Sequence, residues 1–153
     1  MQVNQTKIKK QVEVLEIFPR MLNEYWNLVD FMLREGLKYD GNPMDISDLK
    51  KLIKESQMQL FVMFGSDDGI QYKVFGVCVT RITALPNFNQ CEVILLKGEK
   101  RDLWQDDLAN TIERLAKTAS CKRIAVHARP GWQPFLKTKG WGVKRYLYTK
   151  EIK

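Results

Sequence analysis

The sequence predicts a mixed α+β fold: one sheet of about six strands, two N-terminal helices, a long crossover helix and a short helix near the C-terminus. Three observations predict it. Apolar residues recur at three- and four-residue steps in the helical stretches. Runs rich in β-branched and aromatic residues alternate with turn sequences elsewhere. Between residues 91 and 128, a strand, a helix and a strand follow each other with short links, which requires a parallel pair of strands.

Two helices are expected before the first of these strands. Apolar side chains repeat with helical spacing over residues 18–33, and Gly36 follows as a helix stop. Residues 39–43 read "YDGNP", which is typical of a turn. Either Asp45 or Ser47 can then cap a second helix.

Three neighbouring strands are expected in the middle of the chain. Residues 58–64 and 72–82 flank a tight turn at 65–69, which is the pattern of a β-hairpin. The turn residues of 84–90 interrupt the chain again before a third strand at 91–96. This strand is expected to run antiparallel to the second, as in a meander.

The next part of the chain carries the crossover on which the fold prediction depends. Apolar spacing predicts a long helix from residue 103 to about Ser120, and residues 122–128 resume a strand pattern. Because a helix separates them, the strands at 91–96 and 122–128 should lie side by side and run parallel.

A short helix and a last strand are expected to close the chain. Pro134 suits the first turn of a helix of two turns, and Gly140 suits the left-handed position just past its end. Trp132 lies three and four residues before two apolar residues of that helix, so aromatic side chains should pin it to the sheet. Residues 142–152 alternate in the manner of a strand.

Composition indicates an ordinary globular protein. With 153 residues, 44% hydrophobic and 28% charged, the chain is expected to form a single domain over 1–153. Its three cysteines are odd in number and lack a C-x-x-C pair or nearby histidines, so we expect reduced thiols and no metal site. No apolar run approaches the ~18 residues that span a bilayer. We therefore expect a soluble, intracellular protein with no membrane partner.

The net charge of +7 is unevenly placed along the chain. Residues 97–153 hold 14 Lys and Arg against 6 Asp and Glu, whereas the first 96 residues are nearly balanced. A basic C-terminal half can bind the phosphates of a cofactor, a nucleic acid, or the acidic face of another protein. A solvated lysine-rich surface is the ordinary alternative, and the charge count does not choose among these readings.

The segment 135–141, "FLKTKGW", ends the short helix with a Gly-aromatic pair. Together with the order of elements, it resembles the GNAT superfamily of N-acetyltransferases. The likeness covers nearly the whole chain in layout and about the last 60 residues in motif. More narrowly, "LLKG", "SCKRIAVHARPGW" and the final "KGW" resemble GNAT-like proteins often encoded by bacteriophages and prophages. This likeness implies a place in the host cytoplasm or in the virion.

The GNAT resemblance implies acetyl-CoA as the cofactor. The pantetheine arm would pair with the strand residues Val93, Ile94 and Leu95. The pyrophosphate would rest on backbone amides before the long helix, where the family has glycines. Aligned on the long helix, those glycines fall here on residues with long side chains: Arg101, Leu103 and Gln105. The remaining candidates for the phosphates and the adenine are Gly98, Lys100, Arg101 and Trp104.

Proton handling is the second requirement of the family's chemistry. Glu92 stands near the position of the family's base, although a carboxylate at a strand start is also commonly solvated. The family's acid tyrosine falls on Leu136, which cannot donate a proton. Tyr146 of the expected last strand is the candidate acid in its place, with Tyr148 beside it.

Three functions are compatible with these residues. The missing glycines and the leucine at the acid position favour a non-catalytic binding or virion-associated component, with virion or host proteins as partners. The alternative is an acetyl-CoA-dependent N-acetyltransferase that acts on an amine of a small molecule or protein. A nucleic-acid-binding module is the weakest, prompted by aromatic residues among the lysines and arginines of the basic half.

Overall fold

The computed structural model describes residues 11–38, 43–128, 130–143 and 148–152. Five strands form one sheet in the order β1-β2-β3-β4-β5. They are β1 (Val12–Ile17), β2 (Gln59–Gly65), β3 (Lys73–Ala84), β4 (Asn89–Gly98) and β5 (Cys121–Val126). The first four are antiparallel neighbours, and β5 runs parallel to β4. The predicted α+β fold and its parallel pair are therefore confirmed.

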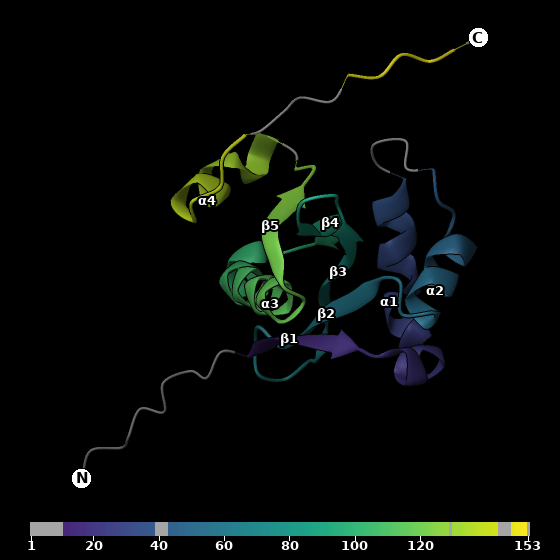
Figure 1. The fold of residues 1–153 in the computed structure, drawn as a ribbon. Coiled ribbons are helices and arrows are strands. Elements are labelled where there is room, and N and C mark those ends of the chain that lie inside the picture. Colours follow the sequence, from purple (N-terminus) through teal and green to yellow (C-terminus); the bar gives the residue numbers. More distant parts are fainter. Residues whose placement is uncertain (1–10, 39–42, 129, 144–147, 153) are drawn as a thin grey trace.

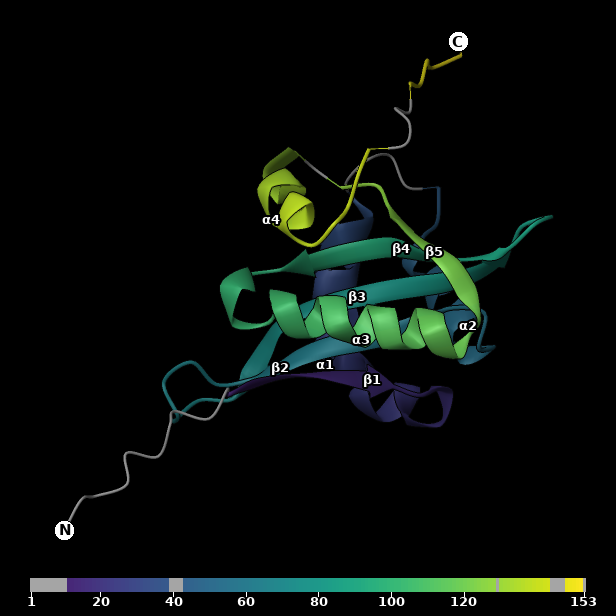
Figure 2. The ribbon, with the colours of Figure 1, turned by 60° about the vertical axis from the view of Figure 1, so that its left-hand side comes forward.

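Helices cover both faces of the sheet (Figures 1 and 2). On one face lie α1 (Leu22–Leu37) and α2 (Ile46–Lys54), and on the other lies α3 (Gln105–Thr118), the expected crossover helix. The short helix α4 (Gln133–Thr138) follows β5. Three single 3-10 turns precede helices, namely η1 (Pro19–Met21), η3 (Arg101–Leu103) and η4 (Pro130–Trp132).

Two hydrophobic cores result, one on each side of the sheet. Val77 and Val79 of β3 pack in the core beneath α1 and α2, and the intervening Cys78 packs in the core beneath α3. This alternation follows from the pleat of the strand, which sends successive side chains to opposite faces. Trp104 is the largest fully buried side chain and belongs to the core under α3.

The structure confirms one predicted helix start and moves one predicted helix end. Asp45 is the cap of α2: its Oδ1 accepts from the amide of Asp48 at 2.8 Å, and Asp48 accepts from the amide of Asp45 at 3.3 Å. Gly36 was wrongly expected to stop the first helix, because α1 continues through Leu37. A Cβ at Gly36 would lie 2.8 Å from Cγ of Leu95, so this glycine lets α1 pack closely on β4.

Strand β1 was not predicted. The first predicted helix starts at residue 18, and no element was predicted for residues 12–17, which pair with β2 along their whole length. The expected last strand at 142–152 is not formed by its described residues, 142–143 and 148–152, which carry no regular structure. Residues 144–147 lie outside the described part of the chain. Five strands, rather than about six, therefore make up the described sheet.

Candidate functional site

The expected cofactor strand lies where β4 and β5 stop pairing. The parallel pairing of the two strands runs from Asn89 beside Cys121 to Val93 beside Val126, where β5 ends. β4 continues five residues further, to Gly98. Along Ile94 to Gly98, the edge of β4 that faces away from β3 therefore has no strand partner among the described residues.

A β-bulge marks the same point. Val79 of β3 pairs with Leu95, and the next residue, Thr80, pairs with Val93, so Ile94 is the extra residue of β4. A bulge bends its strand and interrupts the ladder, which explains why β4 leaves β5 here. The side chains of Val93 and Leu95 are buried in opposite cores, so at these two residues only the backbone is available to a ligand.

Gly98 and Trp104 serve packing in this structure. A Cβ at Gly98 would lie 2.7 Å from the carbonyl oxygen of Phe75 and 2.9 Å from Cζ2 of Trp104. The Trp104 side chain is only 1% exposed, and its Nε1 donates to the carbonyl oxygen of Glu99 at 2.8 Å. The ring therefore has no solvent-exposed face on which an adenine could stack.

Lys100, expected to contact phosphates, forms an ion pair with Asp67 in the turn between β2 and β3. The hydrogen bond from Lys100 and its charge lower the pKa of Asp67, and the carboxylate in turn raises the pKa of Lys100. Lys100 has a left-handed backbone, with φ of 50°, and begins the η3 turn. Its positive charge is therefore already balanced within the protein.

Arg101 joins the two loops that flank the opening between β4 and β5. Its guanidinium lies 4.6 Å from the centre of the Trp132 ring, and its Nη2 donates to the carbonyl oxygen of Gly131 at 3.1 Å. The Trp132 ring also packs against Trp104, with ring centroids 6.2 Å apart. Arg101 thus ties the loop before α3 to the segment after β5.

The start of α3 carries its own negative charges. Asp106 and Asp107 lie in the first helical turn, where a helix favours an anion. Lys139, which follows α4, forms an ion pair with Asp106 at 2.8 Å. The amides of Leu103 and Trp104 donate to carbonyl oxygens within the η3 turn. A pyrophosphate at the start of α3 would therefore meet two carboxylates, although no described side chain caps the amides of the helix.

Glu92, the candidate base, is held in a chain of hydrogen bonds across three strands. Arg81 donates to its Oε2 at 2.8 Å, Gln90 donates to its Oε1 at 3.0 Å, and Arg123 donates to Gln90 at 2.6 Å. Partial burial alone would raise the pKa of Glu92, but the hydrogen bonds from Arg81 and Gln90 outweigh it and lower the pKa. A lowered pKa makes Glu92 a weaker base.

The candidate acid Tyr146 lies outside the described residues. Tyr148 is 87% exposed on the C-terminal segment, and Leu136 occupies α4. Within the described ranges, no group of three or more His, Cys, Asp or Glu residues could hold a metal ion, and no helix could cross a membrane. The Arg123–Gln90–Glu92–Arg81 chain could have been suspected only from cross-strand register, which the sequence does not state.

Comparisons with known proteins bear on the fold. No family model matches the sequence, and no curated protein matches it. An acetyltransferase of Trypanosoma brucei superposes with a TM-score of 0.61 at 10% identity, over 92% of this chain and 99% of that one. An aminoglycoside acetyltransferase from an uncultured soil metagenomic sample, in complex with sisomicin, gives 0.61 at 13% identity, over 95% and 100%.

A GNAT family acetyltransferase of Staphylococcus aureus gives a TM-score of 0.58 at 14% identity, over 93% of this chain and 99% of that one. Each of these proteins is matched along almost its whole length, so the likeness extends over the complete arrangement of sheet and helices. At such low identities the likeness bears on the fold and not on the chemistry. This chain therefore has the fold of the GNAT acetyltransferases.

Proposed function

We propose that this chain is a non-catalytic binding component built on the GNAT fold. The observation that carries the proposal is the state of the loop before α3, where a cofactor pyrophosphate would bind. Its two basic side chains are engaged by Asp67 and by Trp132 with Gly131, and Lys139 covers Asp106 in the first turn of the helix. An incoming pyrophosphate would meet carboxylates at the helix start and would have to break these contacts.

The state of Glu92 supports the same proposal. Both of its carboxylate oxygens accept hydrogen bonds, and its lowered pKa makes it slow to take a proton from an amine. The likeness of "SCKRIAVHARPGW" to phage-encoded proteins supports a virion or host protein as the partner. Purified phage particles that contain the chain at fixed stoichiometry would support this part of the proposal.

The decisive experiment is a thermal melt with and without millimolar acetyl-CoA, repeated by calorimetric titration. We expect no shift. A cofactor present at 100 times its Kd would stabilise the folded state by about 2.7 kcal/mol, which a melt detects readily. A clear stabilisation by acetyl-CoA, absent with acetate or free phosphate, would contradict the proposal.

An acetyl-CoA-dependent N-acetyltransferase is the second candidate, because the unpaired edge of β4 from Ile94 to Gly98 supports it. That edge can pair with an extended pantetheine arm through its backbone groups. The candidate predicts that acetyl-CoA is consumed in the presence of a primary amine. It also predicts that Glu92→Gln abolishes turnover without loss of acetyl-CoA binding.

A further inference from the structure

We propose that the outer edge of β1 binds an extended, basic peptide segment of a partner protein, which joins the sheet as an additional strand. This site is separate from the region between β4 and β5. The inference therefore goes beyond the proposed function and holds whether or not the chain binds acetyl-CoA.

The edge of β1 is suited to pairing. β1 is the first strand in the sheet order, so it pairs on one side only among the described residues. Its six residues pair with β2 in unbroken register, from Val12 beside Gly65 to Ile17 beside Leu60, without a bulge. The backbone N–H and C=O groups on its outer side therefore form a regular row that a further strand can meet.

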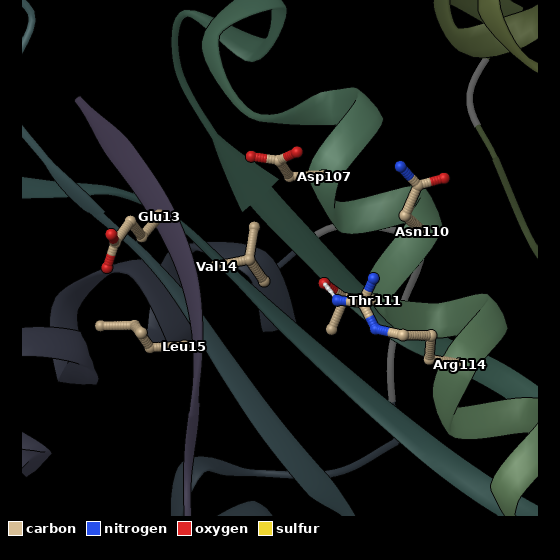
Figure 3. A pocket seen from close by; sticks show the side chains of 7 residues that line it. All are labelled: Glu13, Val14, Leu15, Asp107, Asn110, Thr111 and Arg114. Atoms are coloured by element: carbon tan, nitrogen blue, oxygen red, sulfur yellow. Dashed lines mark hydrogen bonds between the residues drawn. The ribbon is translucent and has the colours of Figure 1, made fainter. Parts of the chain in front are cut away.

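A hollow of about 250 Å³ flanks this edge, between β1 and α3. Figure 3 shows Val14 directed toward α3, while Glu13 and Leu15 point to the other side of the strand. The wall on α3 consists of four polar residues on one side of the helix: Asp107, Asn110, Thr111 and Arg114. From 107 to 114 the helix rises about 10 Å, the length of about three residues of an extended strand.

The charge of the edge selects the partner. Three acidic residues line this edge: Glu13 and Glu16 on β1, and Asp107 on the facing wall. Arg114 is the one basic residue of that wall. Glu16 shares the α3 side of the strand with Val14 by alternation. Its partial burial raises its pKa, and no described hydrogen bond or ion pair compensates it. A lysine or arginine of an added strand would supply that compensation.

A second copy of this chain fits the edge less well than a basic peptide does. A second β1 strand would bring two further glutamates to the edge and no lysine or arginine. It would therefore leave the negative charge of Glu16 without a partner of opposite charge.

The test uses a fluorescent eight-residue peptide that alternates lysine with threonine or valine, and a matched peptide with glutamate in place of lysine. Fluorescence polarisation measures binding, and amide hydrogen exchange locates it. We expect the lysine peptide to bind and to slow exchange at the outward amides of Val12 to Ile17, whereas the glutamate peptide does not bind. Binding of the lysine peptide should weaken as salt is added.

A charge reversal makes the test specific. Glu13→Lys with Glu16→Lys should weaken binding of the lysine peptide about tenfold and allow the glutamate peptide to bind. Glu55→Lys with Glu151→Lys changes the net charge equally at exposed positions away from β1 and should leave binding unchanged. If the double variant at β1 does not fold, Glu13→Lys alone, at an exposed position, should produce a smaller loss in the same direction.

Four results would overturn the proposal. The lysine peptide could fail to bind, it could bind the reversed variant as tightly as the native chain, or exchange could slow at β5 instead of β1. Concentration-dependent dimerisation of the native chain with protection of β1 would also overturn it, in favour of a second copy at this edge. Because acetyl-CoA is absent from these measurements, their outcome is independent of the proposed function.

Discussion

Trp104 and Trp132 pack against each other with their ring centroids 6.2 Å apart and their planes inclined by 47°. Trp104 precedes α3, and Trp132 follows β5 at the start of α4, so this contact joins the two segments that flank the opening between β4 and β5. Phe135 extends the cluster from α4, 6.1 Å from Trp132. The short helix α4 is thus anchored by aromatic side chains.

Substitution of Trp104 should destabilise the fold strongly. Trp104→Ala removes a fully buried indole and should lower the free energy of unfolding by about 3–5 kcal/mol, because the cavity does not collapse fully. Trp132→Ala removes a half-buried ring and should cost clearly less. Urea unfolding followed by circular dichroism measures both. Equal losses for the two variants would contradict the packing described here.

Gly98→Ala should destabilise the protein because the new Cβ would contact backbone atoms. It would lie 2.7 Å from the carbonyl oxygen of Phe75 and 2.9 Å from Cα of Gly76, and neither strand can move freely. We expect a loss of about 1–3 kcal/mol. Gly142→Ala is the matched control, because nothing lies within 4 Å of its Cβ position, and its stability should be unchanged.

The pH dependence of stability should separate Glu92 from Glu16. The pKa of Glu92 is lowered from its ordinary 4.5 by Arg81 and Gln90, so its contribution is present above pH 4.5 and is lost as pH falls through the folded-state pKa. The pKa of Glu16 is raised by burial, so stability is lost as pH rises from 4.5 through the folded-state pKa.

The two carboxylates therefore predict opposite changes in the pH profile. Glu92→Gln should reduce the fall in melting temperature that occurs as the pH is lowered below 4.5. Glu16→Gln should remove the fall in melting temperature that occurs as the pH is raised above 4.5. Thermal melts between pH 3 and 7 measure both variants against the native chain. Parallel profiles for all three proteins would contradict the environments assigned to these residues.

The three thiols should differ in reactivity. Cys78 and Cys91 are buried, and burial raises the pKa of both thiols, to about 12 for Cys91. Cys121 is partly exposed at the start of β5. A thiol reagent at neutral pH should therefore modify Cys121 in the folded protein and the other two only after unfolding. Cys121→Ser should abolish the native-state reaction.

Hydrophobic periodicity alone predicted most elements of this fold. The spacing of apolar residues in α1, α2 and α3 and the β-branched runs of β2, β3, β4 and β5 are local properties, and each can be read along the chain. The parallel pairing of β4 and β5 followed because a connecting helix between neighbouring strands leaves few other arrangements. β1 was missed because its two glutamates interrupt the apolar pattern of a short edge strand.

Only the tertiary structure decided what the candidate site residues do. The sequence placed Lys100, Arg101 and Trp104 before the long helix, but it could not state that Asp67 and Trp132 approach them from distant turns. Glu92 could be chosen from the sequence as the candidate base, but its contacts with Arg81 and Gln90, which lower its pKa, could not be predicted. Local patterns determine helices and strands because they depend on neighbours along the chain. Charge balance and burial depend on neighbours in space, which chain order does not contain.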